Sequence, residues 1–147
     1  MEIHIPNESA MQSLGGALAQ ASEPSSRIYL EGDLGAGKTT LARGFLRGLG
    51  YAGPVKSPTD ALIEPYQLDS CEVNYLDLYR LSDPEELEYI GFRDLLDNES
   101  ILLVEWPDKG SGILPDPDIF VRIQYEKKAH KRARRPTPAI RAREGEK

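Results

Sequence analysis

Gly32-Asp33-Leu34-Gly35-Ala36-Gly37-Lys38-Thr39 matches the phosphate-binding pattern G-x-x-x-x-G-K-[ST] at every fixed position. The apolar segment 27–31 precedes it and has the composition of a β-strand. Residues 40–49 follow it and predict a helix, because their large apolar residues recur on one helical face. A strand, a glycine-rich loop and a helix in this order are the context in which the pattern binds phosphate.

The loop would hold phosphate mainly through its backbone. Glycines let the amides curl around β- and γ-phosphate oxygens, and the N-terminus of the following helix adds a positive field. Lys38 would neutralise phosphate charge, and the Thr39 hydroxyl would ligate Mg²⁺. The structural alternative, a glycine-rich turn before a helix, is disfavoured by this context. We therefore predict a nucleoside triphosphate site with the candidate binding residues Asp33, Gly35, Ala36, Gly37, Lys38, Thr39 and Thr40.

The charge of the chain is unevenly distributed. At 147 residues the chain has room for one sheet and its covering helices, and its formal net charge is −6. Residues 126–147 carry a net charge of +6, whereas residues 1–125 carry −12. So acidic a body would repel a nucleic-acid backbone, which excludes general coating of DNA or RNA. We predict a P-loop ATPase domain over residues 1–127 and a basic, proline-containing, flexible tail over residues 128–147.

Cysteine and hydropathy patterns predict a cytoplasmic protein. Cys71 is the single cysteine, so no disulfide framework and no cysteine metal cluster is expected. Neither His4 nor His130 has a partner at metal-ligand spacing. No apolar run approaches the length needed to cross a bilayer, and the N-terminus lacks a basic-then-apolar signal pattern. We expect no membrane partner.

The remaining pattern predicts an α/β fold with a mixed sheet. Two strand candidates separated only by Asp69-Ser70 suggest a hairpin, so the sheet should be partly antiparallel. A helix should begin at Asp83 and break near Gly91. The predicted strands are 2–5, 27–31, 61–68, 72–79, 101–104 and 119–125, and the predicted helices are 9–21, 40–49 and the broken one after residue 83.

Two acids stand at the ends of predicted strands, where a metal and a water would be held during hydrolysis. Glu105 follows four apolar residues, as expected when a buried strand delivers a carboxylate to its C-terminal edge. We assign Glu105 to the Mg²⁺ shell and Asp77 to water activation or the outer metal shell. The alternatives are a strand-end salt bridge for Glu105 and a turn-capping acid for Asp77. Spacing alone leaves swapped roles open.

One further segment and one further residue each allow more than one interpretation. Ser57-Pro58-Thr59 has the composition of a loop that senses the γ-phosphate through its hydroxyls, and an inert connector is the alternative. Trp106 directly follows Glu105 and is either a wall of the site, a partner surface or a core aromatic.

Six ordered segments together resemble the TsaE (YjeE) family, the small bacterial ATPases of tRNA threonylcarbamoyladenosine biosynthesis. The resemblance runs from about Ile3 to Tyr125. The segments that carry it are Gly32–Thr40, Val55–Thr59, Glu64–Tyr66, Asp77–Leu81, Asp83–Leu87 and Leu103–Pro107.

The resemblance implies a three-layer P-loop NTPase-like fold, with ATP on the loop and Mg²⁺ held by Thr39 and Glu105. It implies that Lys38, Glu105 and Asp77 form the catalytic set, with Asp77 needed for turnover. It also implies TsaD and TsaB as partners, which place threonylcarbamoyl on adenosine 37 of tRNAs that read ANN codons. The tRNA would then be contacted indirectly, through the complex, and ATP hydrolysis would reset that complex between rounds.

Two features depart from the family pattern. Asp60 and Ala61 stand where members carry an aromatic and then Thr or a small residue, so an acid neighbours the predicted γ-phosphate loop. Lys131-Arg132-Ala133-Arg134 only loosely matches a basic element of the family. The second function class is an ATP-loaded switch whose occupancy controls partner assembly while turnover is incidental. A small-molecule kinase lacks the length for a second pocket, and no Asn-Lys-x-Asp segment supports a GTPase.

Overall fold

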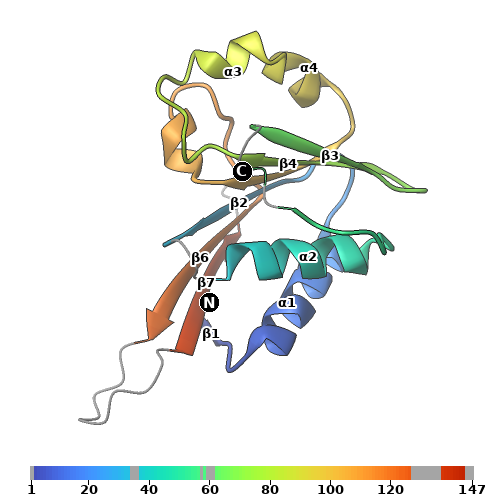
Figure 1. The fold of residues 1–147 in the computed structure, drawn as a ribbon, viewed down its shortest axis with the longest axis vertical. Helices are drawn as coiled ribbons and strands as arrows, with labels where there is room; N and C mark the ends of the chain where they lie inside the picture. Colours follow the sequence, from blue (N-terminus) through green and yellow to red (C-terminus); the bar gives the residue numbers. More distant parts are fainter. Residues whose placement is uncertain (1, 34–36, 57, 59–61, 127–136, 145–147) are drawn as a thin grey trace.

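A seven-stranded sheet lies between two layers of helices (Figure 1). The computed structural model describes residues 2–33, 37–56, 58, 62–126 and 137–144. The strand order is β1-β7-β6-β2-β5-β4-β3. The strands are β1 Glu2–His4, β2 Arg27–Gly32, β3 Ile63–Gln67, β4 Glu72–Asp77, β5 Ile101–Glu105, β6 Ile119–Glu126 and β7 Thr137–Glu144. The helices are α1 Glu8–Ala21, α2 Lys38–Gly48, α3 Glu86–Tyr89, α4 Phe92–Asp97 and the 3₁₀ turn η1 Pro107–Gly110.

The sheet is mixed, as the sequence predicts. The four central strands β6, β2, β5 and β4 run parallel to one another. β3 pairs antiparallel with β4 in a hairpin, and its turn contains the predicted Asp69-Ser70. Because β2, β4 and β5 are parallel, their carboxyl ends meet at one edge of the sheet.

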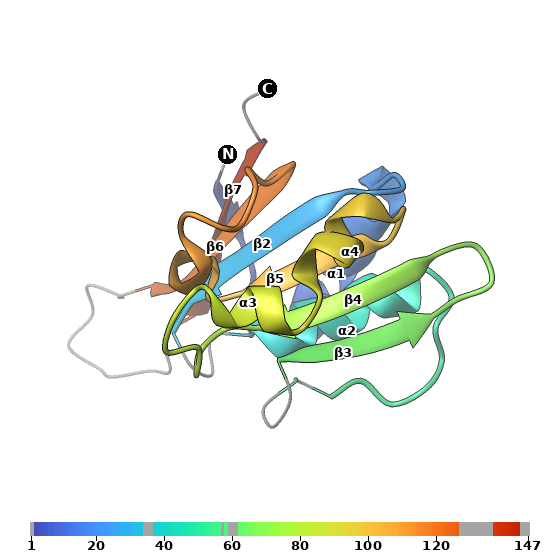
Figure 2. The ribbon, with the colours of Figure 1, turned by 90° about the horizontal axis from the view of Figure 1, so that it is seen from above.

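One face of the sheet is covered by α1 and α2 (Figures 1 and 2). Asn7 caps the start of α1: its side-chain Oδ1 accepts a hydrogen bond from Ala10 N at 2.9 Å and satisfies one of the free amides of the first turn. The two helices touch backbone to backbone. A Cβ added to Gly15 would lie 2.7 Å from Phe45 N, and one added to Gly44 would lie 2.6 Å from Gln12 Cα. Glycine at both positions therefore sets the distance between α1 and the phosphate-loop helix.

The opposite face is covered by α3 and α4, two short helices that follow β4. Asp83 Oδ1 accepts from Glu85 N at 2.9 Å, so the predicted start signal forms, although regular helix begins only at Glu86. The chain breaks where the sequence predicts, because Gly91 has a φ of 77°, in the left-handed region that favours glycine. Leu87 and Phe92 are the fully buried side chains of these helices.

The predicted boundary of the domain is wrong for part of the C-terminal segment. Thr137–Glu144 is strand β7, which pairs antiparallel with both β6 and β1. The segment therefore belongs to the sheet rather than to a tail that begins at residue 128. Hydrogen bonding to two strands, one of them at the other end of the chain, is a long-range effect that the local pattern of charges and prolines does not reveal. Residues 127–136 and 145–147 lie outside the described residues. In the part of the chain that the structure describes, no helix is long and apolar enough to cross a membrane.

Candidate nucleotide site

The candidate site lies where β2, β4 and β5 end, beside the start of α2. β2 ends at Gly32 and α2 begins at Lys38, so the phosphate-binding motif spans the turn between them. Gly37 precedes the helix with a φ of 103°, and a Cβ there would lie 2.9 Å from Met11 Cε. Only glycine can hold this conformation without strain, and the motif requires glycine at this position. The strand–loop–helix context predicted from sequence is confirmed.

The predicted nucleotide-binding residues fall into two groups. Lys38, Thr39 and Thr40 form the first turn of α2, and Asp33 is exposed just after β2. Gly35 and Ala36 lie outside the described residues. The amides of the first helical turn have no partner within a helix, so they are available to an anion.

Lys38 is buried and held by three groups. Its Nζ donates to Gly32 O at 2.7 Å, lies 3.9 Å from Glu105 Oε1, and sits 4.2 Å from the centre of the Trp106 ring. The exposed fraction of Lys38 is 4%. Burial lowers the pKa of Lys38 below its ordinary value, and the nearby carboxylates, led by Glu105 and Asp77, oppose that shift. The cation therefore points toward the strand ends and away from bulk solvent.

Glu105 ends β5 and is 3% exposed. The Tyr75 hydroxyl donates a hydrogen bond to Glu105 Oε2, while Oε1 faces Lys38. The strand-end salt bridge considered as an alternative is therefore present, but its cation is the lysine of the phosphate loop. The ion pair with Lys38 is therefore compatible with a role of Glu105 in the candidate site.

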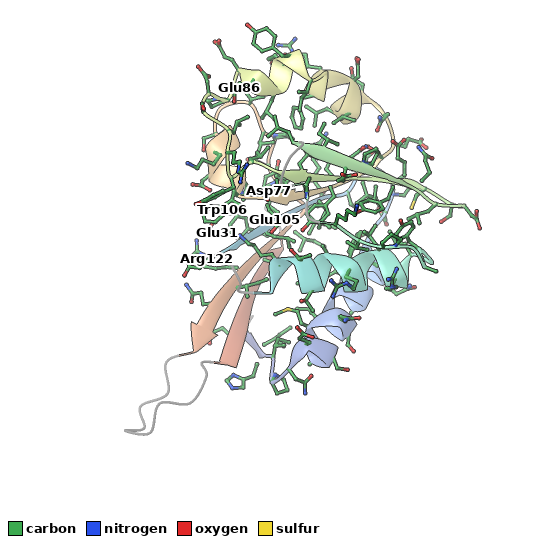
Figure 3. All side chains as sticks on the ribbon, in the orientation of Figure 1. Glu31, Asp77, Glu86, Glu105, Trp106 and Arg122 are labelled. Carbon is green, nitrogen blue, oxygen red and sulfur yellow. The ribbon has the colours of Figure 1, made fainter. Side chains whose placement is uncertain are left out.

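Asp77 ends β4 directly beside Glu105, since the two residues are partners in the parallel register (Figure 3). Asp77 Oδ1 accepts from Tyr79 N at 3.0 Å, so the turn-capping alternative also describes a real contact. The charge of Asp77 nevertheless acts on Lys38. The two acids and the lysine, predicted separately from strand ends and from the motif, are brought together.

Trp106 forms a wall of this site. Its φ of 56° is unusual for a residue other than glycine and turns the ring back from the end of β5. The ring lies over Lys38 and also 4.9 Å, centre to centre, from the ring of Tyr79. A wall of the site, a partner surface and a core aromatic are the three interpretations of Trp106, and its contact with Lys38 supports the first of these.

Tyr75 is the site residue that the sequence analysis missed. It reads as an ordinary apolar position of a buried strand, and no motif marks it. The one available signal is its spacing, because Tyr75 stands two residues before Asp77 and so shares a face of β4 with it.

The donor set fits a Mg²⁺ that is mostly held by phosphate and water. Mg²⁺ prefers oxygen ligands and usually takes one or two from the protein beside substrate phosphates. The Thr39 hydroxyl and the Glu105 carboxylate are such oxygens, and the carboxylate is held by a hydrogen bond from Tyr75. Among the described residues no group of three or more His, Cys, Asp or Glu forms a dedicated metal cage. A nucleotide-dependent metal therefore suits the site better than a resident one.

Most of the predicted γ-phosphate loop lies outside the described residues. The structure does not describe Ser57, Thr59, Asp60 or Ala61, and it places Pro58 in a buried position. Both interpretations of this loop, a γ-phosphate sensor and an inert connector, therefore stay predictions, as does the effect of the acid at position 60.

Comparison with known protein families shows to which family the chain belongs. A family model described as threonylcarbamoyl adenosine biosynthesis protein TsaE matches residues 5–135. The chain belongs to the TsaE family. A tRNA threonylcarbamoyladenosine biosynthesis protein TsaE of Haemophilus influenzae is 50% identical over 127 residues, which cover 83% of this chain and 80% of the relative. The TsaE protein of Bacillus subtilis is 36% identical over 118 residues, covering 80% of this chain and 73% of the relative.

A solved structure supports the fold. The crystal structure of Bacillus subtilis YdiB superposes with a TM-score of 0.76 at 24% identity, covering 97% of this chain and 82% of that one. The family and the three-layer fold with a mixed sheet, both expected from the six segments, are confirmed.

Proposed function

We propose that this protein is a Mg²⁺-dependent ATPase required for threonylcarbamoyladenosine modification of adenosine 37 in tRNAs that read ANN codons. The observation that carries the proposal is the convergence of Lys38, Glu105 and Asp77 at one edge of the sheet, beside the phosphate-binding motif. The names of its relatives supply the pathway. Each residue has a distinct chemical task.

The binding residues act first. The amides at the start of α2 would receive the β- and γ-phosphates, with Lys38 as the cation that neutralises them. Lys38 now donates to Gly32 O, so phosphate oxygens would compete with a backbone carbonyl for this donor. Thr39 and Glu105 would hold Mg²⁺, which supplies charge neutralisation on the phosphate oxygens when bound.

Asp77 would act on the attacking water. A hydrolase of this type needs a group that orients or deprotonates water opposite the leaving phosphate. Asp77 lies on the strand next to Glu105 and keeps one carboxylate oxygen beyond the one that caps Tyr79 N. We therefore assign turnover to Asp77 and metal binding to Glu105.

The partners would be TsaD and TsaB, in the cytoplasm, with ATP hydrolysis resetting their complex between rounds. The acidic body makes strong direct contact with tRNA unfavourable, so we expect the tRNA to be reached through that complex. Turnover should be weak alone and stimulated by the pair.

The alternative is a switch that binds ATP and controls assembly, with incidental turnover. One observation favours keeping it: Lys38 already has a carbonyl, a carboxylate and an aromatic partner, so nucleotide binding would have to rearrange these contacts. Such a rearrangement can signal occupancy without any hydrolysis.

ATP hydrolysis by the purified protein with Mg²⁺, measured with and without TsaD and TsaB, tests the proposal. We expect stimulation by the pair that is lost in Glu105→Ala and Asp77→Ala. Asp69→Ala, in the exposed β3–β4 turn, is the matched control and should behave as wild type. Tight ATP binding with no partner-dependent turnover would replace the enzyme with the switch.

A further inference from the structure

Tyr75 occupies a position that the proposed reaction does not yet use. It is fully buried on β4, and it heads the fully buried side chains of the described residues by volume. Its Cα partner on β5 is Leu103, so Glu105 is its diagonal neighbour two residues further along that strand. The phenol ring thus reaches from the interior of the sheet to the carboxyl edge.

The hydroxyl of Tyr75 fixes one oxygen of Glu105. It donates to Oε2, and Lys38 Nζ lies on the side of Oε1. A buried carboxylate is costly unless its oxygens have hydrogen-bond or charge partners. Tyr75 satisfies one oxygen with a neutral donor, so that oxygen is held without a second cation in the site.

Tyr75 is a neutral donor to Glu105. Burial raises the pKa of Tyr75 far above its ordinary value and the charge of Glu105 raises it further, whereas the Thr39 side chain opposes both effects. The phenol therefore keeps its hydrogen for the Glu105 carboxylate.

We propose that Tyr75 is the positioning residue of the divalent-cation site, whose hydroxyl holds the Glu105 carboxylate in place. The inference rests on the proposed function, because it assumes that a nucleotide and a divalent cation bind here. Tyr75 would not touch the reacting atoms; it would act by orienting the carboxylate that holds the cation.

A purely structural role would look different. A buried tyrosine needs a hydrogen-bond partner, and a backbone carbonyl suffices for that purpose. Tyr29, which is also buried but lies on β2, donates to the Pro115 carbonyl. Tyr75 instead donates to a carboxylate at the site. Tyr29→Phe is accordingly the matched control for Tyr75→Phe, since each substitution removes one buried hydroxyl and keeps the ring.

The test is a Mn²⁺ titration of the full chain loaded with ADP, followed by electron paramagnetic resonance of free Mn²⁺. We expect Tyr75→Phe to bind Mn²⁺ about tenfold more weakly, since a hydrogen bond to a charged group is lost. Its affinity for ADP without metal should stay within about twofold of wild type, because the phosphate loop is intact. Tyr29→Phe should match wild type in both measurements.

Equal or tighter Mn²⁺ binding by Tyr75→Phe would overturn the inference while leaving the proposed function in place. Wild-type protein that binds ADP but takes up no Mn²⁺ would contradict both. A second measurement needs no variant: in wild-type protein, bound Mn²⁺ should broaden the ring resonances of Tyr75. Unbroadened Tyr75 resonances in a sample that holds Mn²⁺ would also contradict the inference.

Discussion

The layer formed by α1 and α2 and the layer formed by α3 and α4 cover opposite faces of the same sheet and are held together differently. α1 and α2 are long helices whose backbones touch at Gly15 and Gly44. The other layer consists of two short helices joined at Gly91, with Tyr89 exposed to 87%. The candidate nucleotide site uses both layers, since Lys38 begins α2 and Asp77 leads toward α3.

Residues that stabilise the fold and residues that form the candidate site therefore lie in different parts of the molecule. Contact between two backbones cannot adjust by a side-chain rotation, so the α1–α2 contact should tolerate little change. The polar groups at the strand ends are held by a few hydrogen bonds and can be altered one at a time. Substitutions in the first region should change folding, and those in the second should change ligand binding and turnover.

The largest effect should come from the site. Glu105→Gln keeps an oxygen that accepts from Tyr75 but loses the charge that would hold Mg²⁺. We expect Mg²⁺-dependent ATP turnover to fall about 100-fold or more, with the free energy of unfolding changed by less than about 1 kcal/mol. Steady-state phosphate release and urea unfolding measure the two quantities. Glu99→Gln, exposed just before the opposite end of β5, is the control and should change neither. A large loss of folding stability in Glu105→Gln would contradict the separate roles of the two regions.

The helix contact gives the next largest effect. Gly15→Ala would force a Cβ against the backbone of α2 and should lower the free energy of unfolding by about 3 kcal/mol. Gly16→Ala, one residue along the same helix, has its nearest neighbour at 3.8 Å and should raise it by about 0.5 kcal/mol through helix propensity. Urea unfolding of the pair decides the point. If both variants lose stability alike, the backbone contact is not the cause.

The break between α3 and α4 should matter less. Gly91→Ala places a side chain at a φ of 77°, and we expect a loss of about 1 kcal/mol. Its Cβ would meet nothing closer than Asp94 Oδ2 at 3.8 Å, so strain is the only cost. Thermal unfolding beside Gly15→Ala tests the ranking. A loss as large as that of Gly15→Ala would show that the two layers are equally constrained.

The smallest effect is spectroscopic and depends on pH. Burial raises the pKa of Tyr29, Tyr66 and Tyr75 above the ordinary value of 10. A raised folded-state pKa means that these groups favour the folded state below pH 10 and that this contribution is lost as the pH rises through the folded values. At pH near 10.5, absorbance at 295 nm should therefore increase when urea unfolds the protein. Tyr75→Phe should reduce that increase, and an unchanged absorbance on unfolding would contradict the burial of these phenols.

Local patterns were enough to predict the phosphate site and most of the strands. The Gly37-Lys38-Thr39 segment is a local motif, and Glu105 follows a continuous apolar strand, so both could be placed without knowing the fold. Parallel strands then bring Asp77 beside Glu105.

Local sequence patterns could not predict the features that depend on long-range contacts. β7 exists because Thr137–Glu144 pairs with strands at both ends of the chain, which no local alternation of residues reveals. The role of Tyr75 depends on a side chain of a neighbouring strand, and the position of the Trp106 ring depends on a left-handed backbone. Such features follow from tertiary pairing rather than from propensity.

The most direct test of the account is the effect of Asp77→Ala on tRNA modification in the complete TsaD–TsaB system. Affinity for ATP, measured by calorimetry, should stay within a few-fold of wild type, because Lys38 and the α2 amides are unchanged. Repeated rounds of threonylcarbamoyladenosine formation should stop, since under the proposed function the hydrolysis that would reset the complex is lost. Modification that continues at the wild-type rate with this variant would contradict the assignment of turnover to Asp77 and favour the switch.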